Sequence, residues 1–210
     1  MTQKQTNPVR RGRPPKNGYS PEETRQRLIR QGIEVFTEKG FSSSGLDEIL
    51  RQEKVPKGSF YHYFQSKEAF GEAVITEYAQ YFANKLDRNF NNEQLSPMQR
   101  LQSFVDEACH GMQKHKFKRG CLIGNLGQEL GSLPPAYRVQ LDSVFLNWQM
   151  RLGLLLQAAQ EAGELSKDED TKALSAFFWI GWEGAILKSK LEISEQPIRL
   201  FIQYFMRLCR

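Results

Sequence analysis

The chain has 210 residues, of which 40% are hydrophobic and 25% charged, a balance typical of a folded protein with one or two domains. No stretch approaches the roughly 20 apolar residues that span a bilayer, and the N-terminus lacks a hydrophobic signal segment, so we expect a cytoplasmic protein with no membrane partner. The three cysteines are too few for a disulfide framework and show no metal-ligand spacing to histidine, so we predict no metal site and no cofactor.

The first 19 residues are predicted to form a disordered basic arm, because they contain prolines and no apolar periodicity. The first 20 positions hold five of the 29 basic residues and no acidic one, so the net charge of +5 resides there. Arg11-Gly12-Arg13-Pro14 resembles an AT-hook core, in which Arg11 and Arg13 would enter an A·T-rich minor groove. A solubilising tail that only contacts phosphates is an equal alternative.

Residues 20–66 contain the signals of three short helices. Ser20-Pro21-Glu22-Glu23 is typical of a capping box that opens the first helix, and Lys39-Gly40 is typical of its end. Ser44-Gly45-Leu46-Asp47 is a second capping signature, and we include Ser44 among the candidate DNA-binding residues. Residues 52–55 then form the turn into the third helix.

The third helix is predicted to run from Pro56 to Phe64, with proline at its first position. Its core face would hold Phe60, Tyr63 and Phe64. The opposite face offers groups that hydrogen-bond phosphates or base edges, from Lys57, Ser59, Tyr61 and His62. Gly58 weakens the helix by roughly 1 kcal/mol, and close approach to a DNA backbone would explain its presence.

The next helix is predicted to start at Lys67, after a Ser66 cap. A cation there is unfavourable for the helix dipole, and a nearby DNA phosphate would relieve the mismatch. Three helices in this arrangement fit a helix-turn-helix head whose last helix enters the major groove. A generic three-helix bundle with a solvated polar face is the alternative.

Three motifs carry a family resemblance in residues 24–70: Phe36-Thr37-Glu38-Lys39-Gly40-Phe41, Gly58-Ser59-Phe60-Tyr61-His62-Tyr63-Phe64 and Ser66-Lys67-Glu68. Together they closely resemble the DNA-binding domain of the TetR/AcrR family of bacterial regulators. The resemblance implies that residues 67–210 form a larger all-helical domain that binds an inducer and dimerises.

The second part of the chain shows helical periodicity and no strand alternation, so the predicted fold class is all-α. The expected helices lie at about 67–89, 97–115, 119–130, 134–162, 168–190 and 194–208. Residues 137–160 and 173–191 are predicted to form a homodimer interface, an assignment that the resemblance implies as much as the periodicity. The apolar stripe of the first comprises Leu141, Val144, Phe145, Trp148, Leu152, Leu155 and Leu156.

Cys121 is the most distinctive residue of this second part. It follows Lys116, Lys118 and Arg119 and a predicted helix start, features that lower the pKa of a thiol and favour a reactive thiolate. Its Gly-Cys-Leu context also resembles TetR-family regulators that respond to electrophiles. That resemblance implies that Cys121 is the sensor and Lys190 a polar partner; a non-covalent pocket or an inert core cysteine are the alternatives.

Four further residues are candidates for a ligand pocket: Asn125, Trp148, Trp182 and Glu183. Glu183 lies in an otherwise apolar helix, so its carboxylate must find a partner or change protonation. A salt bridge or an interface hydrogen bond is its structural alternative, and tryptophans at helical spacing are core residues by default.

These features predict a homodimeric transcriptional repressor that binds double-stranded operator DNA. An inducer, either an electrophile or a small unsaturated acid, would bind or modify the second domain and release the DNA. An architectural DNA-binding protein dominated by the basic arm is one alternative. An enzyme with Cys121 as nucleophile is another, but no histidine is placed by the sequence to activate the thiol.

Overall fold

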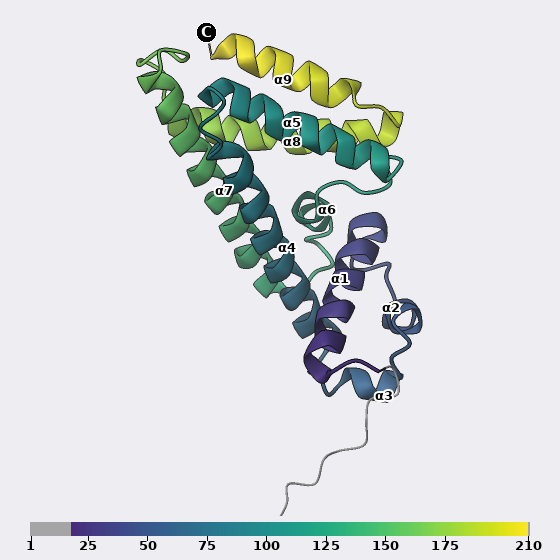
Figure 1. The fold of residues 1–210 in the computed structure, drawn as a ribbon. Helices are drawn as coiled ribbons and strands as arrows, with labels where there is room; N and C mark the ends of the chain where they lie inside the picture. Colours follow the sequence, from purple (N-terminus) through teal and green to yellow (C-terminus); the bar gives the residue numbers. More distant parts are fainter. Residues whose placement is uncertain (1–17, 210) are drawn as a thin grey trace, which may run out of the picture.

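The computed structural model describes residues 18–209, whose regular elements are all α-helices (Figure 1). The head comprises α1 (Pro21–Lys39), α2 (Leu46–Gln52) and α3 (Lys57–Phe60). The body comprises α4 (Lys67–Phe90), α5 (Pro97–Lys114), α6 (Leu122–Gln128), α7 (Pro135–Glu161), α8 (Thr171–Glu192) and α9 (Gln196–Leu208). The predicted all-α fold class is confirmed. The predicted basic arm, with Arg11 and Arg13, lies outside the described residues.

Local capping signals set the starts of α1 and α4. The Glu23 N–H donates to the Ser20 hydroxyl at 3.2 Å, and the Ser20 N–H donates to the Glu23 carboxylate at 2.7 Å. Gly40 ends α1 with a φ of +84°, a conformation that glycine adopts readily. Ser66 caps α4 by accepting the Ala69 N–H at 3.1 Å. Both helices therefore begin where the sequence predicts.

The start of α2 differs from the prediction. Its N-cap is Gly45, and no side chain caps the helix. Ser44 is buried and donates its hydroxyl to the carbonyl oxygen of Gly40, four residues back. Serine readily makes such local bonds to the backbone, so Ser44 closes the loop after α1 instead of opening α2.

The third helix is shorter than predicted. Pro56 is its N-cap, with an extended ψ of 140°, and the helix ends at Phe60. Tight turns follow, in which the His62 N–H donates to the Ser59 carbonyl at 3.1 Å and the Tyr63 N–H to the Phe60 carbonyl at 2.9 Å. Glycine at position 58 disfavours a longer helix, and the turns still allow the rings of Phe60 and Phe64 to reach the core.

The body is built around the two long helices α4 and α7, which run side by side away from the head (Figure 1). The far layer contains α5, α8 and α9, and α6 lies between that layer and α1. The body helices follow the predicted ranges closely except α6, which is shorter than the expected 119–130. Cys121 is extended, with φ −86° and ψ 124°, so α6 begins only at Leu122.

The apolar stripe predicted for the dimer interface on α7 packs inside the chain instead. Six of its seven residues are buried, and Phe145 is partly buried against the same core. The Trp148 ring lies 4.3 Å from Phe82 and 5.0 Å from Trp179, between centroids. A wide stripe is therefore the side of α7 that faces its own chain, because a helix in a bundle buries its broadest apolar face first.

Candidate functional site

The turn that begins with α3 presents a polar face to solvent. Tyr61 is 57% exposed, and the side chain of Lys57 is 64% exposed. His62 is exposed, Ser59 is half-buried, and no atom lies within 4 Å of where a side chain on Gly58 would begin. Phe60 and Phe64 are buried on the opposite side, so the polar and apolar side chains separate between the two faces as the sequence predicts.

Two of the predicted DNA-binding residues, Ser44 and Lys67, are wholly or partly buried and hydrogen-bond to backbone carbonyls just after α1. Ser44 is buried and bonded to Gly40, so its side chain does not face solvent. The Lys67 ammonium donates to the carbonyl oxygen of Phe41 at 2.8 Å and lies 4.3 Å from the centroid of the Phe41 ring. Burial lowers the pKa of Lys67. Within the protein, the carbonyl and the ring of Phe41 contact this cation at the helix start, and the DNA phosphate that we expected stays a prediction.

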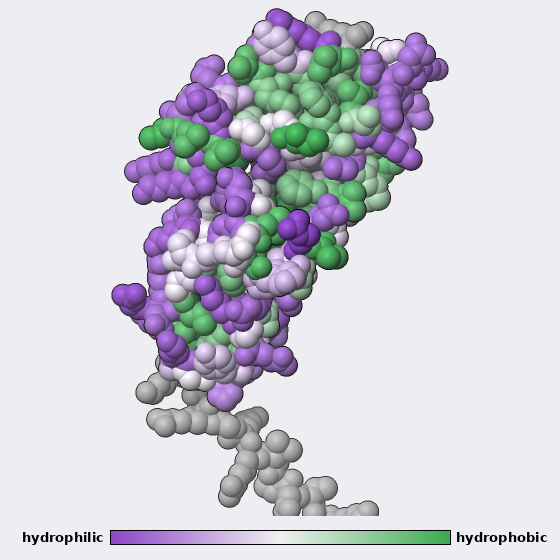
Figure 2. Space-filling model, turned by 180° about the vertical axis from the view of Figure 1, so that it is seen from behind, coloured by the Kyte–Doolittle hydropathy of each residue, from purple (hydrophilic) through white to green (hydrophobic). Residues whose placement is uncertain are grey.

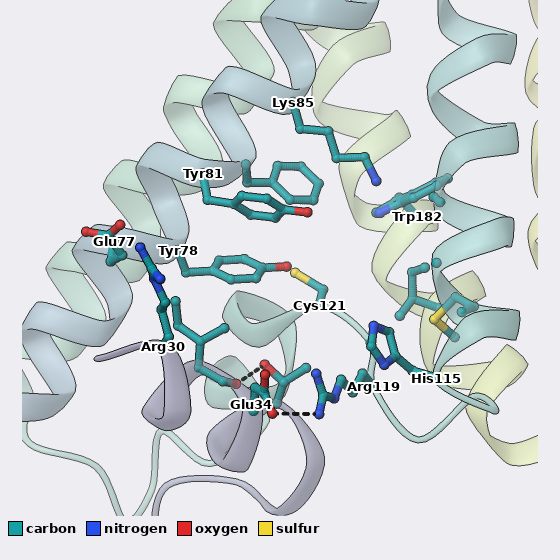
Figure 3. Close-up of a pocket in the computed structure, with 18 residues that line it drawn as sticks. Arg30, Glu34, Glu77, Tyr78, Tyr81, Lys85, His115, Arg119, Cys121 and Trp182 are labelled. Carbon is teal, nitrogen blue, oxygen red and sulfur yellow. Dashed lines mark hydrogen bonds and ion pairs between the residues drawn. The ribbon is translucent and has the colours of Figure 1, made fainter. Parts of the chain in front are cut away.

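A cavity of about 500 Å³ lies between the head and the body (Figure 3). Its walls come from α1, α4, α5, α8 and the loop before α6. The lining includes Tyr78, Tyr81, Phe82, Met112, Trp182 and Ile186, together with the basic side chains Arg30, Lys85, His115 and Arg119. An apolar cavity of this size with a few polar groups suits a small organic ligand.

Cys121 lines this cavity as the N-cap of α6 and is only 4% exposed. Its Sγ accepts the Gly124 N–H at 3.4 Å. Burial, followed by the charge of Glu183, raises the pKa of the Cys121 thiol well above its usual value. The prediction of a thiolate at rest is therefore wrong. The neighbouring Arg119 does not offset burial, because it pairs with Glu34 at 3.0 Å and with Glu38 at 2.7 Å.

Two acidic groups surround the Cys121 sulfur. The Tyr78 hydroxyl points at Sγ (Figure 3), and its influence lowers the pKa of the thiol. The Glu183 carboxylate lies next to the same sulfur, against Gly124, the residue whose N–H bonds to Sγ. Burial raises the pKa of Glu183 to about 7, and its interaction with Cys121 opposes the rise. The Oε1 atom of Glu183 is buried without a hydrogen-bond partner among the described residues.

The other predicted pocket residues divide between this cluster and the core. Trp182 lines the cavity. Asn125 lies one turn along α6 from Cys121, and its Oδ1 is 3.4 Å from the Lys190 ammonium, whose pKa is lowered by burial. Trp148 belongs to the core around Phe82 and does not line the cavity, because its stripe of α7 faces inward.

Residues in and next to α6 also form hydrogen bonds and ion pairs with the head, a role that the sequence did not predict. The Asn125 amide donates to the Thr37 carbonyl at 2.7 Å. The Glu129 carboxylate accepts the N–H groups of Phe41 and Ser42 at 3.1 and 2.8 Å. With the Arg119 ion pairs, these contacts join the cavity wall to α1 and to the loop after it. The partners are far apart along the chain, so no local pattern could have indicated them.

A third feature is an apolar surface on the far layer, visible on the upper part of Figure 2. We call it the α8–α9 face. Its exposed large side chains are Phe177, Ile180, Leu187 and Leu191 from α8, and Leu200, Tyr204 and Leu208 from α9. Exposed large apolar side chains gathered on two packed helices are typical of an interaction site. This face shares α8 with the predicted interface but adds α9.

Neither a cluster of metal-ligand side chains nor a membrane-spanning helix is found in the part of the chain that the structure describes. No group of three or more His, Cys, Asp or Glu side chains there could hold a metal ion. No helix within residues 18–209 combines the length and the apolar character needed to cross a membrane. The three cysteines are all buried and unpaired.

Known proteins match both parts of this architecture. Residues 28–74 match the model of bacterial regulatory proteins of the tetR family, and residues 97–205 match the tetracyclin repressor-like C-terminal domain. The transcriptional regulator AcuR of Cereibacter sphaeroides is 51% identical over 94% of this chain and 90% of its own length. The HTH-type transcriptional repressor NemR of Escherichia coli K12 is 28% identical over 87% of this chain and 92% of its own.

Solved structures agree with these matches. The regulatory protein TetR from Rhodobacter sphaeroides superposes with a TM-score of 0.86 at 52% sequence identity, covering 88% of this chain and 98% of that one. The reduced form of E. coli NemR superposes with a TM-score of 0.83 at 26% identity, covering 90% and 97%. The helix-turn-helix head, the helical body and these relatives lead to one conclusion: the chain belongs to the TetR family of bacterial transcriptional regulators.

Proposed function

We propose that this regulator is a homodimeric repressor that releases its operator when a small electrophile reacts with Cys121. The observation that carries the proposal is the position of Cys121. Its thiol lines a cavity of about 500 Å³, and the helix that it caps contacts the head directly. A change of shape at the thiol therefore has a short physical route to the DNA-binding surface.

The DNA contact is assigned to the polar face of α3 and the turn after it. The exposed side chains of Lys57, Tyr61 and His62, with the half-buried Ser59, offer charged and polar donors for phosphates and base edges. Gly58 leaves the backbone open to close approach. In a helix-turn-helix dimer, two such faces would enter major grooves about one helical turn apart. Lys67 is assigned a supporting role because its ammonium is held by Phe41.

The α8–α9 face supports the dimer. A two-fold axis through this face would bury the same apolar side chains twice, which is how most homodimers close. The spacing of the two heads would then depend on how each body holds its own head. Any rearrangement at α6 would alter that spacing and so the match to the operator.

The coupling between Cys121 and the DNA-binding surface would run through the hydrogen bonds between the α6 region and the head. Asn125 and Glu129 hold the carbonyl of Thr37 and the amides of Phe41 and Ser42. An adduct on Cys121 would push against Tyr78, because the hydroxyl of that side chain already points at the sulfur. An inducer releases DNA only to the extent that it favours the conformation unable to bind it. Closely packed contacts of this kind shift together instead of bending independently.

A non-covalent inducer is the second candidate, and the composition of the cavity supports it. The walls combine aromatic side chains with basic ones, an arrangement that would hold a small organic acid without any bond to sulfur. In that case Cys121 would only line the pocket. A covalent inducer therefore requires the Cys121 thiol, whereas a non-covalent inducer does not.

The test is release of a fluorescent fragment of the protein's own upstream DNA, followed by anisotropy. Acrolein would be titrated against the wild-type protein and against Cys121→Ser, with propanal as the saturated control. Release of the wild type by acrolein alone, with no response of Cys121→Ser, is the expected result. Equal release of both proteins would move the proposal to a non-covalent inducer, and DNA that stays bound throughout would contradict electrophile sensing.

A further inference from the structure

Cys121 poses a chemical problem for any reaction with an electrophile. The nucleophile is the thiolate, yet burial keeps this sulfur in the protonated form. The nearby basic side chains do not solve the problem, because Arg119 is held by two glutamates and Lys190 is bonded to Asn125. A reactive thiol in this setting needs a group that takes its proton as the reaction proceeds.

Glu183 is placed to be that group. Its carboxylate lies against Gly124, the residue whose N–H is bonded to the Cys121 sulfur, and its Oε1 is buried without a hydrogen-bond partner among the described residues. The groups that act on the pair come from three elements: the thiol and the Gly124 N–H from α6, the Tyr78 hydroxyl from α4 and the Lys190 ammonium from α8. None of these forms an ion pair with Glu183, so the carboxylate is free to bind a proton.

The chain also makes room for this carboxylate. A Cβ atom on residue 124 would lie only 1.8 Å from Glu183 Oε2, so the carboxylate occupies the space that glycine leaves open. Gly127, on the same short helix, meets no atom within 4 Å and imposes no such requirement. Glycine at position 124 thus lowers helix propensity, but it leaves space for a buried carboxylate beside the thiol. Packing alone would be better served by alanine and an apolar partner.

We propose that Glu183 accepts the Cys121 proton when the thiol adds to an electron-poor alkene, an inference that rests on the proposed function. The S–H bond breaks as its proton moves to the carboxylate, and the sulfur forms a bond to the β-carbon. The electron pair of the C=C bond shifts toward the carbonyl group of the alkene. Glu183 then returns the proton to the α-carbon, so that nothing is lost and no oxidant is needed.

Two contacts on the sulfur assist the same step. The Gly124 N–H and the Tyr78 hydroxyl both point hydrogen-bond donors at Sγ, where negative charge develops during the addition. Such pre-oriented donors stabilise charge at the moment it forms. The thiol therefore stays protonated at rest and becomes a nucleophile only with an alkene in the cavity. This arrangement would spare the sensor from reacting indiscriminately.

The test is the rate at which N-ethylmaleimide labels Cys121 in the full-length protein, followed by peptide mass spectrometry from pH 6 to pH 9. The buried Cys109 and Cys209 serve as internal references. Glu183→Gln keeps the size of the side chain and removes the base. Because general-base catalysis typically contributes about 100-fold or more, labelling at pH 7.5 should slow by about tenfold or more. The wild-type rate should rise near pH 7, and the variant rate only at more alkaline pH.

The opposite result is equally informative. A carboxylate that merely repels the thiolate would make Glu183→Gln react faster than the wild type, and this outcome, or an equal rate, overturns the inference. Gly124→Ala should displace the carboxylate and slow labelling in the same way, whereas Gly127→Ala should not. The two substitutions raise helix propensity equally. A difference between their labelling rates therefore reports on the position of the Glu183 carboxylate.

The inference and the proposed function fail separately. If wild-type Cys121 is labelled quickly but the labelled protein stays on its operator, electrophile sensing fails and the role of Glu183 stands. If Glu183→Gln is labelled as fast as the wild type and still releases DNA, the role of Glu183 fails and electrophile sensing stands.

Discussion

The polar face of α3 and of the turn after it is largely exposed to solvent, whereas the cluster around Cys121 is buried where α4, α6 and α8 meet. Tyr61 and Lys57 are largely exposed, whereas the Cys121 thiol and the Glu183 Oε1 atom are buried. On the exposed face, chemistry follows from the residue types themselves. In the buried cluster it follows from the surroundings, which suppress the ionisation of Cys121 and of Glu183.

The largest expected effect is a difference between alanine substitutions of two neighbouring aromatic residues in the head, Phe60 and Tyr61. Phe60 packs against the rings of Phe64 and Phe70 at 5.4 and 5.6 Å, so Phe60→Ala should lower the free energy of unfolding by about 3–5 kcal/mol. Tyr61→Ala should change it by less than about 1 kcal/mol. Tyr61→Ala should nevertheless lose operator binding. Thermal unfolding and anisotropy on the operator measure the two effects.

Retained operator affinity in a folded Tyr61→Ala protein would contradict the assignment of this face to DNA. Tyr61→Phe is the matched control for the ring, because it keeps the aromatic contact with Phe60 and removes only the hydroxyl. If Tyr61→Phe also loses binding, the hydroxyl is the group that contacts DNA.

The next effect is a pH dependence of stability that the exposed face cannot produce. The pKa of Glu183 is about 7 in the folded chain, against an ordinary value of 4.5. Between these pH values the folded chain holds a proton that the unfolded chain has released. The free energy of unfolding therefore falls as pH rises through this window, by about 3 kcal/mol in all, and stays low at higher pH.

Glu183→Gln should remove this fall, so the variant should match the wild type below pH 4.5 and exceed it in stability at pH 8. Urea unfolding of both proteins across this range measures the difference, and ionisable groups common to both cancel. Parallel curves would mean that the carboxylate is solvated in the folded protein, which would remove the contrast between the two regions.

A moderate effect is expected where the regions meet. Glu129→Ala deletes the acceptor for two backbone N–H groups after α1, which should cost about 1–3 kcal/mol of unfolding free energy. It should also weaken the response of DNA binding to acrolein, since the head loses a contact with α6. The neighbouring Gln128→Ala is the control, because its side chain is exposed and makes only a long bond of 3.4 Å to Gly124. An unchanged response in Glu129→Ala would place the coupling elsewhere.

Sequence reasoning succeeded where neighbours in space are also neighbours in the chain. The capping box of Ser20 and the opposed faces of Phe60 and Tyr61 depend on residues within one helical turn, so short patterns predict them. The length of α3 was wrong because turns after Phe60 hold Phe64 in the core as well as a helix would. The Ser44 cap was wrong because its hydroxyl donates back to the Gly40 carbonyl instead of accepting an N–H from the first turn of α2.

The environment of Cys121 could not be predicted in this way. Its adjacent cations, including Arg119, favoured a thiolate, but folding pairs Arg119 with two glutamates of α1. The groups that do act on the sulfur include Tyr78 from α4 and Glu183 from α8, and packing of three helices brings them together. Local charge therefore predicts the pKa of an exposed group better than that of a buried one, because burial outweighs it.

The smallest expected effect concerns an ion pair on the exposed face, between Lys57 and Asp47. The Lys57 ammonium lies 3.0 Å from the Asp47 carboxylate, and both side chains are more than 60% exposed at 64% and 69%. Such a pair contributes little, so Asp47→Asn should change the free energy of unfolding by about 0.5 kcal/mol at most. It should raise operator affinity several-fold, because Lys57 is released for a phosphate and a nearby negative charge is removed. Glu48→Gln is the control: it removes the same charge from the same first turn but frees Lys39 instead. A larger gain from Asp47→Asn assigns the effect to Lys57, whereas equal gains would reduce it to net charge and leave Lys57 without a specific contact.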